Sequence, residues 1–278
     1  MLGIVVDERG QVTAEARVPT PVGADAIIGA IAGLAETLGP GLPVGVGAPG
    51  LVDAEGVLRF APNLPGVVDV PMRGQLIARL GVPVVIENDA TAACWAEREV
   101  GAAAGSNDVV VVTLGTGIGG GIVSGGILQR GANGFAGEIG HIVLSADGPD
   151  CPCGMKGCWE RYASGSGLTR LARERGVGER GEEVTALAAA GDVLALEVMA
   201  DFAWWVALGL VSLTYLLDPS LFVIGGGLVE AGELLLQPTR EAFTGLLAGS
   251  RHRPPVGIVG AALGERAGAI GAALLARQ

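Results

Sequence analysis

Short apolar runs rich in valine and isoleucine alternate with helix-like segments along most of this chain. Such alternation is typical of an α/β protein, in which parallel strands are connected by helices that cover the sheet. A boundary near Ser106–Asn107 separates two clusters of strands. We expect strands at residues 2–7, 43–50, 82–89, 108–115, 221–227 and 256–261. We expect helices at residues 24–38, 72–80, 90–104, 167–175, 194–217, 230–248 and 265–276, a glycine-rich hairpin at 115–126 and loops at 131–160.

The composition argues against several classes of protein. Half of the residues are hydrophobic and 17% are charged, which predicts a packed protein rather than a disordered one. The net charge of −11 argues against nucleic acid or an anionic membrane as a partner, because both attract basic surfaces. The longest apolar run, residues 202–217, contains Gly, Ser and Thr and stops at Asp218, so we expect a buried helix rather than a membrane span. No signal-peptide pattern is visible, and we expect a cytoplasmic protein.

Three of the four cysteines lie within eight positions and follow one of the two histidines. His141, Cys151, Cys153 and Cys158 form the pattern H-x9-C-x-C-x4-C. In the cytoplasm, clustered cysteines favour a metal over a disulfide, and one histidine with three cysteines is a closed tetrahedral set for structural zinc. The alternative is three buried thiols with a hydrogen-bonded histidine, although unrelated core cysteines do not cluster in this way. We expect the remaining cysteine, Cys94, to be a small core residue.

Two glycine-rich segments are compatible with nucleotide binding. In "LGTGIGGGIVSGG" (114–126), backbone N–H groups of a turn and the hydroxyl of Thr116 can hold phosphate oxygens. Taken alone, a hairpin without a ligand explains this segment equally well. In "VIGGGL" (223–228), glycines end a strand and open a helix. Neither segment has the spacing of a Rossmann or Walker A motif.

Several polar residues stand in apolar or glycine-rich surroundings. In "IENDATAA" (86–93), Asp89 is a helix N-cap, the better reading of this segment alone, or a carboxylate at the edge of a sheet, and the two readings are compatible with each other. Each of the other polar residues, taken singly, is more often a solvated surface group. Together they are the hydroxyl-binding groups that a sugar site requires. The set consists of Asn63, Asn88, Asp89, Glu138 and Glu160.

The segments "APNLPG", "ENDATAA", "LGTGIGGGIVSGG", "GANGFAGEIGH" and "CPCGMKGCWERYASG" together resemble the ROK family (repressors, open reading frames and sugar kinases), most closely its bacterial glucokinases. The resemblance runs from about residue 2 to the C-terminus. It implies the actin-like ATPase (ribonuclease H-like) fold, with two α/β domains and a substrate cleft between them. Residues 1–107 and 263–278 would form the small domain, and residues 108–262 the large domain with the zinc loop. It also implies a homodimer or homotetramer.

The resemblance implies a function as well: transfer of the γ-phosphoryl group of ATP, with Mg²⁺, to the 6-hydroxyl of glucose. By position, Asp89 resembles the base that takes the proton from the sugar. His141 would bind zinc through one ring nitrogen and face the sugar with the other. The hexose-binding set would be Asn63, Asn88, Asp89, Glu138, His141 and Glu160. The nucleotide contacts would be Thr116, Gly117, Gly119 and Gly120 in the phosphate loop, and Gly225, Gly226 and Gly227 at the adenosine.

The start of the chain departs from the family pattern. Members begin with a strand and a D-x-G-G-T-K-type phosphate loop, followed by a strand like "GIVVDERGQV", with which this chain opens. We expect a start codon placed too late; a catalytically impaired sugar-binding protein is the alternative. A sugar-responsive repressor is disfavoured by the charge and by the lack of a helix-turn-helix segment. Mannose, fructose or an N-acetylated hexose as substrate, and polyphosphate as donor, stay open.

Overall fold

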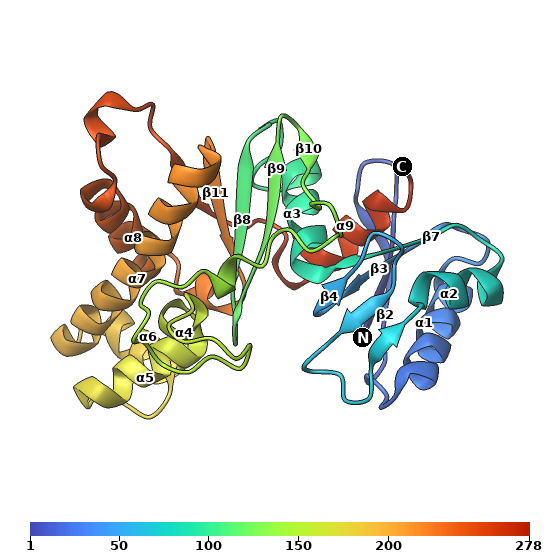
Figure 1. Ribbon diagram of the computed structural model, residues 1–278, viewed down its shortest axis with the longest axis horizontal. Coiled ribbons are helices and arrows are strands. Elements are labelled where there is room, and N and C mark those ends of the chain that lie inside the picture. The colour runs from blue at the N-terminus through green and yellow to red at the C-terminus, as the bar shows by residue number, and fades with distance from the viewer.

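Two groups of strands, on either side of helices α3 and α9, form the two lobes of the computed structural model, which describes residues 1–278 (Figure 1). The lobe after α3 is built on a mixed sheet of order β10-β9-β8-β11-β12. In this sheet β8, β11 and β12 run parallel, while β9 is antiparallel to β8 and β10 is antiparallel to β9. Its strands are β8 (Val109–Leu114), β9 (Ile118–Ser124), β10 (Ile127–Leu128), β11 (Leu221–Gly225) and β12 (Gly257–Gly260). Its helices are α4 (Glu160–Ala163), α5 (Gly165–Arg175), α6 (Gly181–Ala189), α7 (Val193–Leu217) and α8 (Glu233–Leu246).

Strand β8 is apolar on both faces because both faces of the sheet are covered. Val110 and Val112 belong to the buried cluster that contains Phe202 of α7. The alternate residues Val109 and Val111 belong to the cluster on the opposite face, toward α3. Successive side chains of a strand point to opposite faces, so a run of four valines fits a central strand between two layers.

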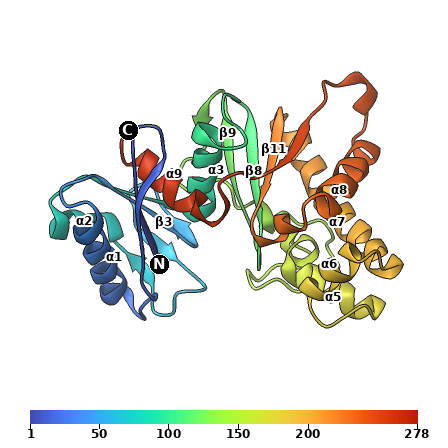
Figure 2. The same cartoon turned by 180° about the vertical axis from the view of Figure 1, so that it is seen from behind.

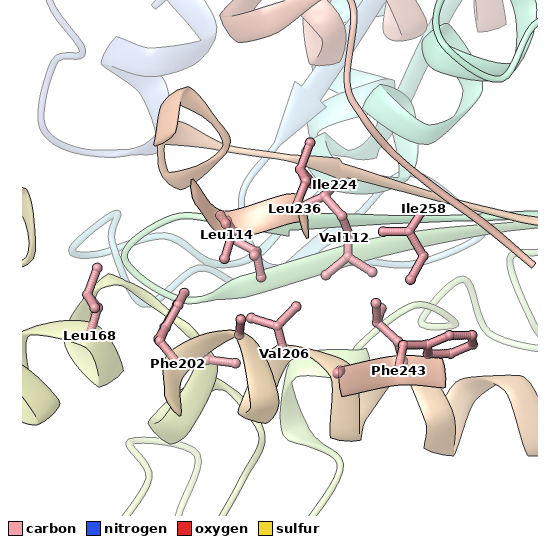
Figure 3. Close-up of a cluster of buried hydrophobic side chains, with 14 of the residues drawn as sticks. Val112, Leu114, Leu168, Phe202, Val206, Ile224, Leu236, Phe243 and Ile258 are labelled. Carbon is pink, nitrogen blue, oxygen red and sulfur yellow. The ribbon is translucent and has the colours of Figure 1, made fainter. Parts of the chain in front are cut away.

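Helix α7 is long and apolar enough to cross a membrane by length and composition. In this fold half of its most apolar stretch is buried. Phe202 and Val206 lie beneath Val112 and Leu114 of the sheet, and Phe243 of α8 extends the same layer (Figure 3). The position of α7 agrees with the expectation of a buried helix.

The lobe before α3 does not form one continuous sheet. Strand β1 pairs only with β2, and β3 pairs only with β7, in parallel. A largely apolar cavity of about 510 Å³, lined by β1, α1, β3 and α9, lies between these two pairs, and Asp89 also lines it. The strands are β1 (Leu2–Val6), β2 (Val12–Arg17), β3 (Val44–Ala48), β7 (Val84–Asn88) and a separate sheet of β4 (Leu51–Val52), β5 (Leu58–Phe60) and β6 (Val68–Val70). The helices are α1 (Ala24–Leu38), α2 (Met72–Leu80), α3 (Asp89–Val100) and α9 (Ala267–Leu275).

The C-terminal helix α9 returns to the first lobe and packs against α3, as the view from behind shows (Figure 2). The contact is close enough to require glycine. A Cβ atom on Gly271 would lie 1.7 Å from the carbonyl oxygen of Ala92, and one on Gly45 would lie 1.8 Å from that of Ala272. The backbones of α9, α3 and β3 therefore touch with no side chain between them.

Local sequence signals set the helix ends. Asp192 caps α7, because its carboxylate accepts the N–H of Ala195 at 2.9 Å. Gly81 and Gly176 end α2 and α5 in the left-handed conformation, which glycine adopts without strain. The observed bounds of α1 and α2 match the expected helices at 24–38 and 72–80. Strands β2, β4, β5, β6 and β10 and helices α4 and α6 were not expected.

Candidate active site

The two glycine-rich segments meet at one edge of the large sheet. Strands β8 and β11 are parallel neighbours, with Thr113 opposite Gly225, so the chain beyond each strand leaves the sheet at the same edge. Gly226 follows β11 with φ of +80°, and a Cβ atom there would lie 2.3 Å from the carbonyl oxygen of Leu114. The second glycine segment thus rests directly on the end of β8. Gly227 is exposed beside it.

The turn between β8 and β9 is short and open. The N–H of Gly115 donates to the carbonyl of Gly117 at 3.0 Å, and the carbonyl of Gly115 accepts the N–H of Gly165 at 2.8 Å. Thr116 is exposed at the tip, so its hydroxyl is free to meet a ligand. A turn with accessible N–H and O–H donors can hold an anion.

Two other glycines of this segment, Gly119 and Gly120, lie within β9, beyond the turn. A Cβ atom on Gly119 would lie 2.8 Å from Cβ of Ala90, and one on Gly120 would lie 2.3 Å from Cδ1 of Ile139. Packing against α3 and against the short 3-10 helix at residues 139–141 therefore requires glycine at both positions. Their expected contact with the nucleotide stays a prediction.

The cap of helix α3 is Asn88, and the interpretation of Asp89 as the cap is wrong. The side-chain oxygen of Asn88 accepts the N–H groups of Ala90 and Thr91 at 2.9 and 3.0 Å, and its amide donates to the carbonyl of Gly50 at 3.0 Å. Asp89 is the first residue of the helix and remains accessible from solvent. Its surroundings nevertheless exclude enough water from the carboxylate to raise its pKa above the ordinary aspartate value. One oxygen of this carboxylate also accepts the N–H of Ala90 at 2.8 Å, but the cap is made by Asn88, so Asp89 can serve another role.

The side chains of His141, Cys151, Cys153 and Cys158 form one cluster, in which the four potential ligand atoms all lie within 4.8 Å of one another. The Sγ atoms of Cys153 and Cys158 are 3.6 Å apart, and Sγ of Cys151 is 3.7 Å from Nδ1 of His141. In a tetrahedral zinc site with Zn–S bonds of about 2.3 Å, neighbouring ligand atoms lie about 3.8 Å apart. No disulfide joins these cysteines. The donor set and its spacing fit a tetrahedral metal ion.

The fourth cysteine has a different role. Cys94 is completely buried in α3, beneath Gly121 of β9. Burial raises the pKa of its thiol to about 12, so it stays protonated and unreactive at neutral pH. The expectation of a core cysteine is confirmed.

His141 and Glu160 connect the metal cluster to the rest of the site. Nδ1 of His141 faces Cys151, while Nε2 lies 3.9 Å from a carboxylate oxygen of Glu138. One oxygen of Glu160 accepts from Sγ of Cys151 at 3.1 Å. A Cβ atom on Gly117 would lie 2.7 Å from the other oxygen, so Glu160 contacts the cysteine cluster and the β8–β9 turn at once.

The acidic groups are close enough to influence one another. Burial raises the pKa of Glu138, the charges of Asp89 and Glu160 raise it further, and His141 opposes this increase. The structure thus brings together Asp89, Glu138, His141 and Glu160. Asn63 lies exposed in the turn between β5 and β6, and its side chain takes part in none of these interactions.

Sequence patterns alone did not predict one ion pair beside this site. Glu87, the last residue but one of β7, is buried and pairs with Nε of Arg130 at 2.6 Å. The available signal was a charged residue in an otherwise apolar buried strand, since such a residue needs a partner.

Comparison with known proteins identifies the family. The profile of the ROK family matches residues 1–278. The chain belongs to the ROK family. A glucokinase from Streptomyces coelicolor is 40% identical over 296 residues, an alignment that covers 99% of this ROK chain and 93% of that protein.

Solved ROK structures share the fold over the whole chain. The crystal structure of a ROK family glucokinase from Streptomyces griseus, in complex with glucose and AMPPNP, matches with a TM-score of 0.87 at 40% identity and covers 100% of this chain and 99% of that one. The ROK hexokinase from Thermus thermophilus matches with a TM-score of 0.82 at 35% identity and covers 99% and 97%. The expected family and its actin-like α/β fold are confirmed.

Proposed function

We propose that this ROK-family chain is an ATP-dependent glucokinase that transfers the γ-phosphoryl group of ATP to the 6-hydroxyl of glucose. The observation that carries the proposal is the group of Asp89, Glu138, His141 and Glu160, gathered beside an accessible glycine turn. A carboxylate, sugar-binding groups and a phosphate-holding turn are the parts that phosphoryl transfer to an alcohol requires. The relative from Streptomyces griseus, crystallised with glucose and AMPPNP, supports the same substrates.

In this proposal Asp89 accepts the proton of the attacking hydroxyl. Its raised pKa favours that step, because a base of higher pKa holds the proton more strongly. Glu138, His141 and Glu160, with Asn63 and Asn88, bind the other hydroxyls. Thr116 and Gly117 hold phosphate oxygens, and Gly225, Gly226 and Gly227 lie against the adenosine. Mg²⁺ bound with ATP would neutralise charge on the phosphates.

The cysteine cluster has a structural role in the same proposal. Zinc would be held by His141, Cys151, Cys153 and Cys158, and a closed set of four protein ligands leaves no position for a reacting water. Binding through Nδ1 would fix the ring of His141 and leave Nε2 to meet a sugar hydroxyl.

We also propose that the protein is cytoplasmic and self-associates, as a homodimer or homotetramer, and that its small domain comprises residues 1–107 and 263–278. Exposed apolar side chains on α7, among them Val193, Trp204 and Leu216, support self-association. Size-exclusion chromatography with light scattering measures the oligomeric state.

A coupled assay for glucose 6-phosphate tests the activity. Formation of the product from glucose and ATP, with lower kcat/KM for mannose, fructose and N-acetylmannosamine, is the expected result. Replacing ATP with polyphosphate in the same assay tests the donor. Glucose binding by calorimetry without turnover would instead indicate a sugar-binding protein that has lost its kinase activity.

A further inference from the structure

Three acidic side chains are buried in this protein, and each has a partner. Asp53 pairs with Arg59, and Glu97 accepts backbone N–H groups. Glu87 has one carboxylate oxygen 2.6 Å from Nε of Arg130, and the other accepts the N–H of Asn88 at 3.0 Å. A buried carboxylate without a partner costs several kcal/mol, so the ion pair with Arg130 holds Glu87 in this position.

The two members of this ion pair lie at the start of two segments of the proposed site, one with the base Asp89 and the other with the sugar-binding Glu138. Glu87 is followed directly by Asn88 and Asp89, at the junction between β7 and α3. Arg130 follows β10 and opens the loop of residues 131–138, which ends at Glu138. The ion pair therefore links the segment of Asp89 to the segment of Glu138, although the two are far apart in the sequence.

The loop of residues 131–138 is fixed to both lobes. Near its middle, the carbonyl of Asn133 accepts the N–H of Ala54 at 3.2 Å, and a Cβ atom on Gly134 would lie 2.8 Å from the same N–H nitrogen. At its end, a Cβ atom on Gly137 would lie 2.8 Å from the carbonyl oxygen of Gly120 in β9. With Ala54 holding the middle and β9 the end, the contact of Arg130 with Glu87 holds the start.

We propose that the Glu87–Arg130 ion pair positions Glu138 relative to Asp89 and thereby sets the affinity of the site for its sugar. Neither residue is placed in contact with the sugar; both act through the backbone segments that they join. The nature of the ligand, a hexose, rests on the proposed function, whereas the geometry of the ion pair does not.

The variants Arg130→Gln, Arg130→Lys and Glu87→Gln test this role. R130Q should raise KM for glucose about tenfold while KM for ATP stays within about twofold, because the ion pair joins the segments of Asp89 and Glu138 and includes none of the proposed nucleotide contacts. R130K should recover part of the loss, since an ammonium keeps the charge but not the geometry of the guanidinium. The double variant E87Q/R130Q should be no worse than either single variant, as for two residues that act as one unit.

A control removes an exposed Arg–Glu ion pair that lies elsewhere. Arg173 and Glu179 pair at 3.0 Å with both side chains exposed on the large lobe, so R173Q should leave both KM values unchanged. Equal effects of R130Q and R173Q would overturn the proposal. So would a parallel rise of both KM values in R130Q together with a lower Tm, which is the pattern of a general loss of structure.

Hydrogen exchange measured by mass spectrometry gives a result that does not depend on activity. In R130Q, exchange in residues 131–138 should become faster, while exchange in α7 stays unchanged. Unchanged exchange in this loop would overturn the proposal even if the kinetics changed. If calorimetry shows that the wild-type protein binds no glucose, the proposed function fails, and the exchange experiment still decides whether the ion pair holds the loop.

Discussion

At the scale of single residues, Asn88 and Asp89 have separate roles. Asn88 caps helix α3, whereas Asp89 is the carboxylate at the edge of the sheet; the sequence alone offered both roles to Asp89. Asn88 accepts the N–H groups of Ala90 and Thr91, so the start of α3 keeps its cap even without the carboxylate of Asp89, which shares the N–H of Ala90 at 2.8 Å. Asp89 stands at the same junction with a raised pKa and an accessible side chain. The fold can therefore tolerate a change at Asp89 that the reaction cannot.

Asp89→Asn should lower kcat by about 10²- to 10⁴-fold or more, because the amide cannot accept a proton. The same change should not lower Tm at neutral pH. The pKa of Asp89 is higher in the fold than in the unfolded chain, so its ionised form reduces stability as the pH rises through these values, and the neutral amide removes that cost. Steady-state kinetics measures the expected loss of kcat, and thermal unfolding checks that Tm is not lowered. A variant with wild-type kcat would exclude Asp89 as the base.

The raised pKa of Asp89 also predicts the pH dependence of the reaction. A general base acts as the carboxylate, and this form is lost as the pH falls through the pKa. The acid limb of the kcat/KM profile should therefore lie above the ordinary aspartate value of about 3.9. A profile measured between pH 4 and pH 8 checks this. An acid limb at or below the ordinary value would contradict the role of desolvation at this carboxylate.

At the scale of elements, the segment from His141 to Glu160 has little regular structure and carries the four potential metal ligands. Its regular pairing is limited to isolated bridges between Val143 and Cys158 and between Asp150 and Lys156. Turn hydrogen bonds such as those from Leu144 to Gly157 and from Cys151 to Met155 hold the rest of the loop, and a bound metal would add a constraint between His141 and the three cysteines.

Cys153→Ser should reduce zinc from one ion per chain to well below one, and should weaken glucose binding because His141 loses its orientation. A loss of about 2 kcal/mol would lower Tm by about 4–8 °C for a protein of this size. Elemental analysis, calorimetry and thermal unfolding measure the three effects. Cys94→Ala is the control, since it removes a cysteine outside the cluster and should leave zinc at one per chain. Full zinc content in C153S would contradict the assigned ligand set.

The close contact between α3 and α9 predicts that a side chain at Gly271 lowers the free energy of unfolding, and Gly33 in α1 provides a control. Gly271→Ala would place a Cβ atom 1.7 Å from the carbonyl oxygen of Ala92, so the helices must separate, at a cost of about 3 kcal/mol or more. Gly33 lies inside α1 with open space around it, and Gly33→Ala should stabilise the protein by about 0.5–1 kcal/mol. Denaturant unfolding of both variants measures the difference. Equal stabilities would show that α9 can shift without loss.

The sequence could predict elements whose signal is local. Helices α1 and α2 have clear apolar periodicity, and Gly81 marks the end of the second. Strands β4, β5 and β6 contain only two or three residues each, too few to show a period, and their pairing with one another is what defines them. The site residues also fall into those with a local signal and those without one. Local motifs identified Asp89 and the cysteine cluster, whereas the Glu87–Arg130 ion pair joins residues that only the tertiary fold brings together.

At the scale of the whole molecule, the chain crosses between the lobes twice, and one carboxylate holds both crossings. Glu97 of α3 accepts the N–H of Ala102 at 2.7 Å on the path from α3 to β8. It also accepts the N–H groups of Ala262 and Leu263 at 3.0 and 2.9 Å on the path from β12 to α9. Glu97 thus holds the two connections against each other, and we predict that the lobes rotate about this junction.

The arrangement of the proposed sugar ligands makes this rotation testable. Asp89 lies on α3, at the junction with the small lobe, whereas Glu160 belongs to α4 of the large lobe. A sugar held by both would bridge the two lobes, so we expect it to draw them closer, and closing the site would also keep water away from the phosphoryl group. Small-angle X-ray scattering should show a smaller radius of gyration with saturating glucose than without ligand. Glucose at one hundred times its Kd should also stabilise the protein by about 2.7 kcal/mol.

Galactose, which differs from glucose at one hydroxyl, is a suitable control sugar and should change neither quantity at equal concentration. An unchanged radius of gyration alongside the full thermal stabilisation would contradict closure while leaving glucose binding intact. In that case the lobes would already have their bound arrangement. The carboxylate of Glu97 would then hold the two connections in one fixed arrangement. Rotation about it would require a second arrangement of the lobes that the ligand binds more tightly.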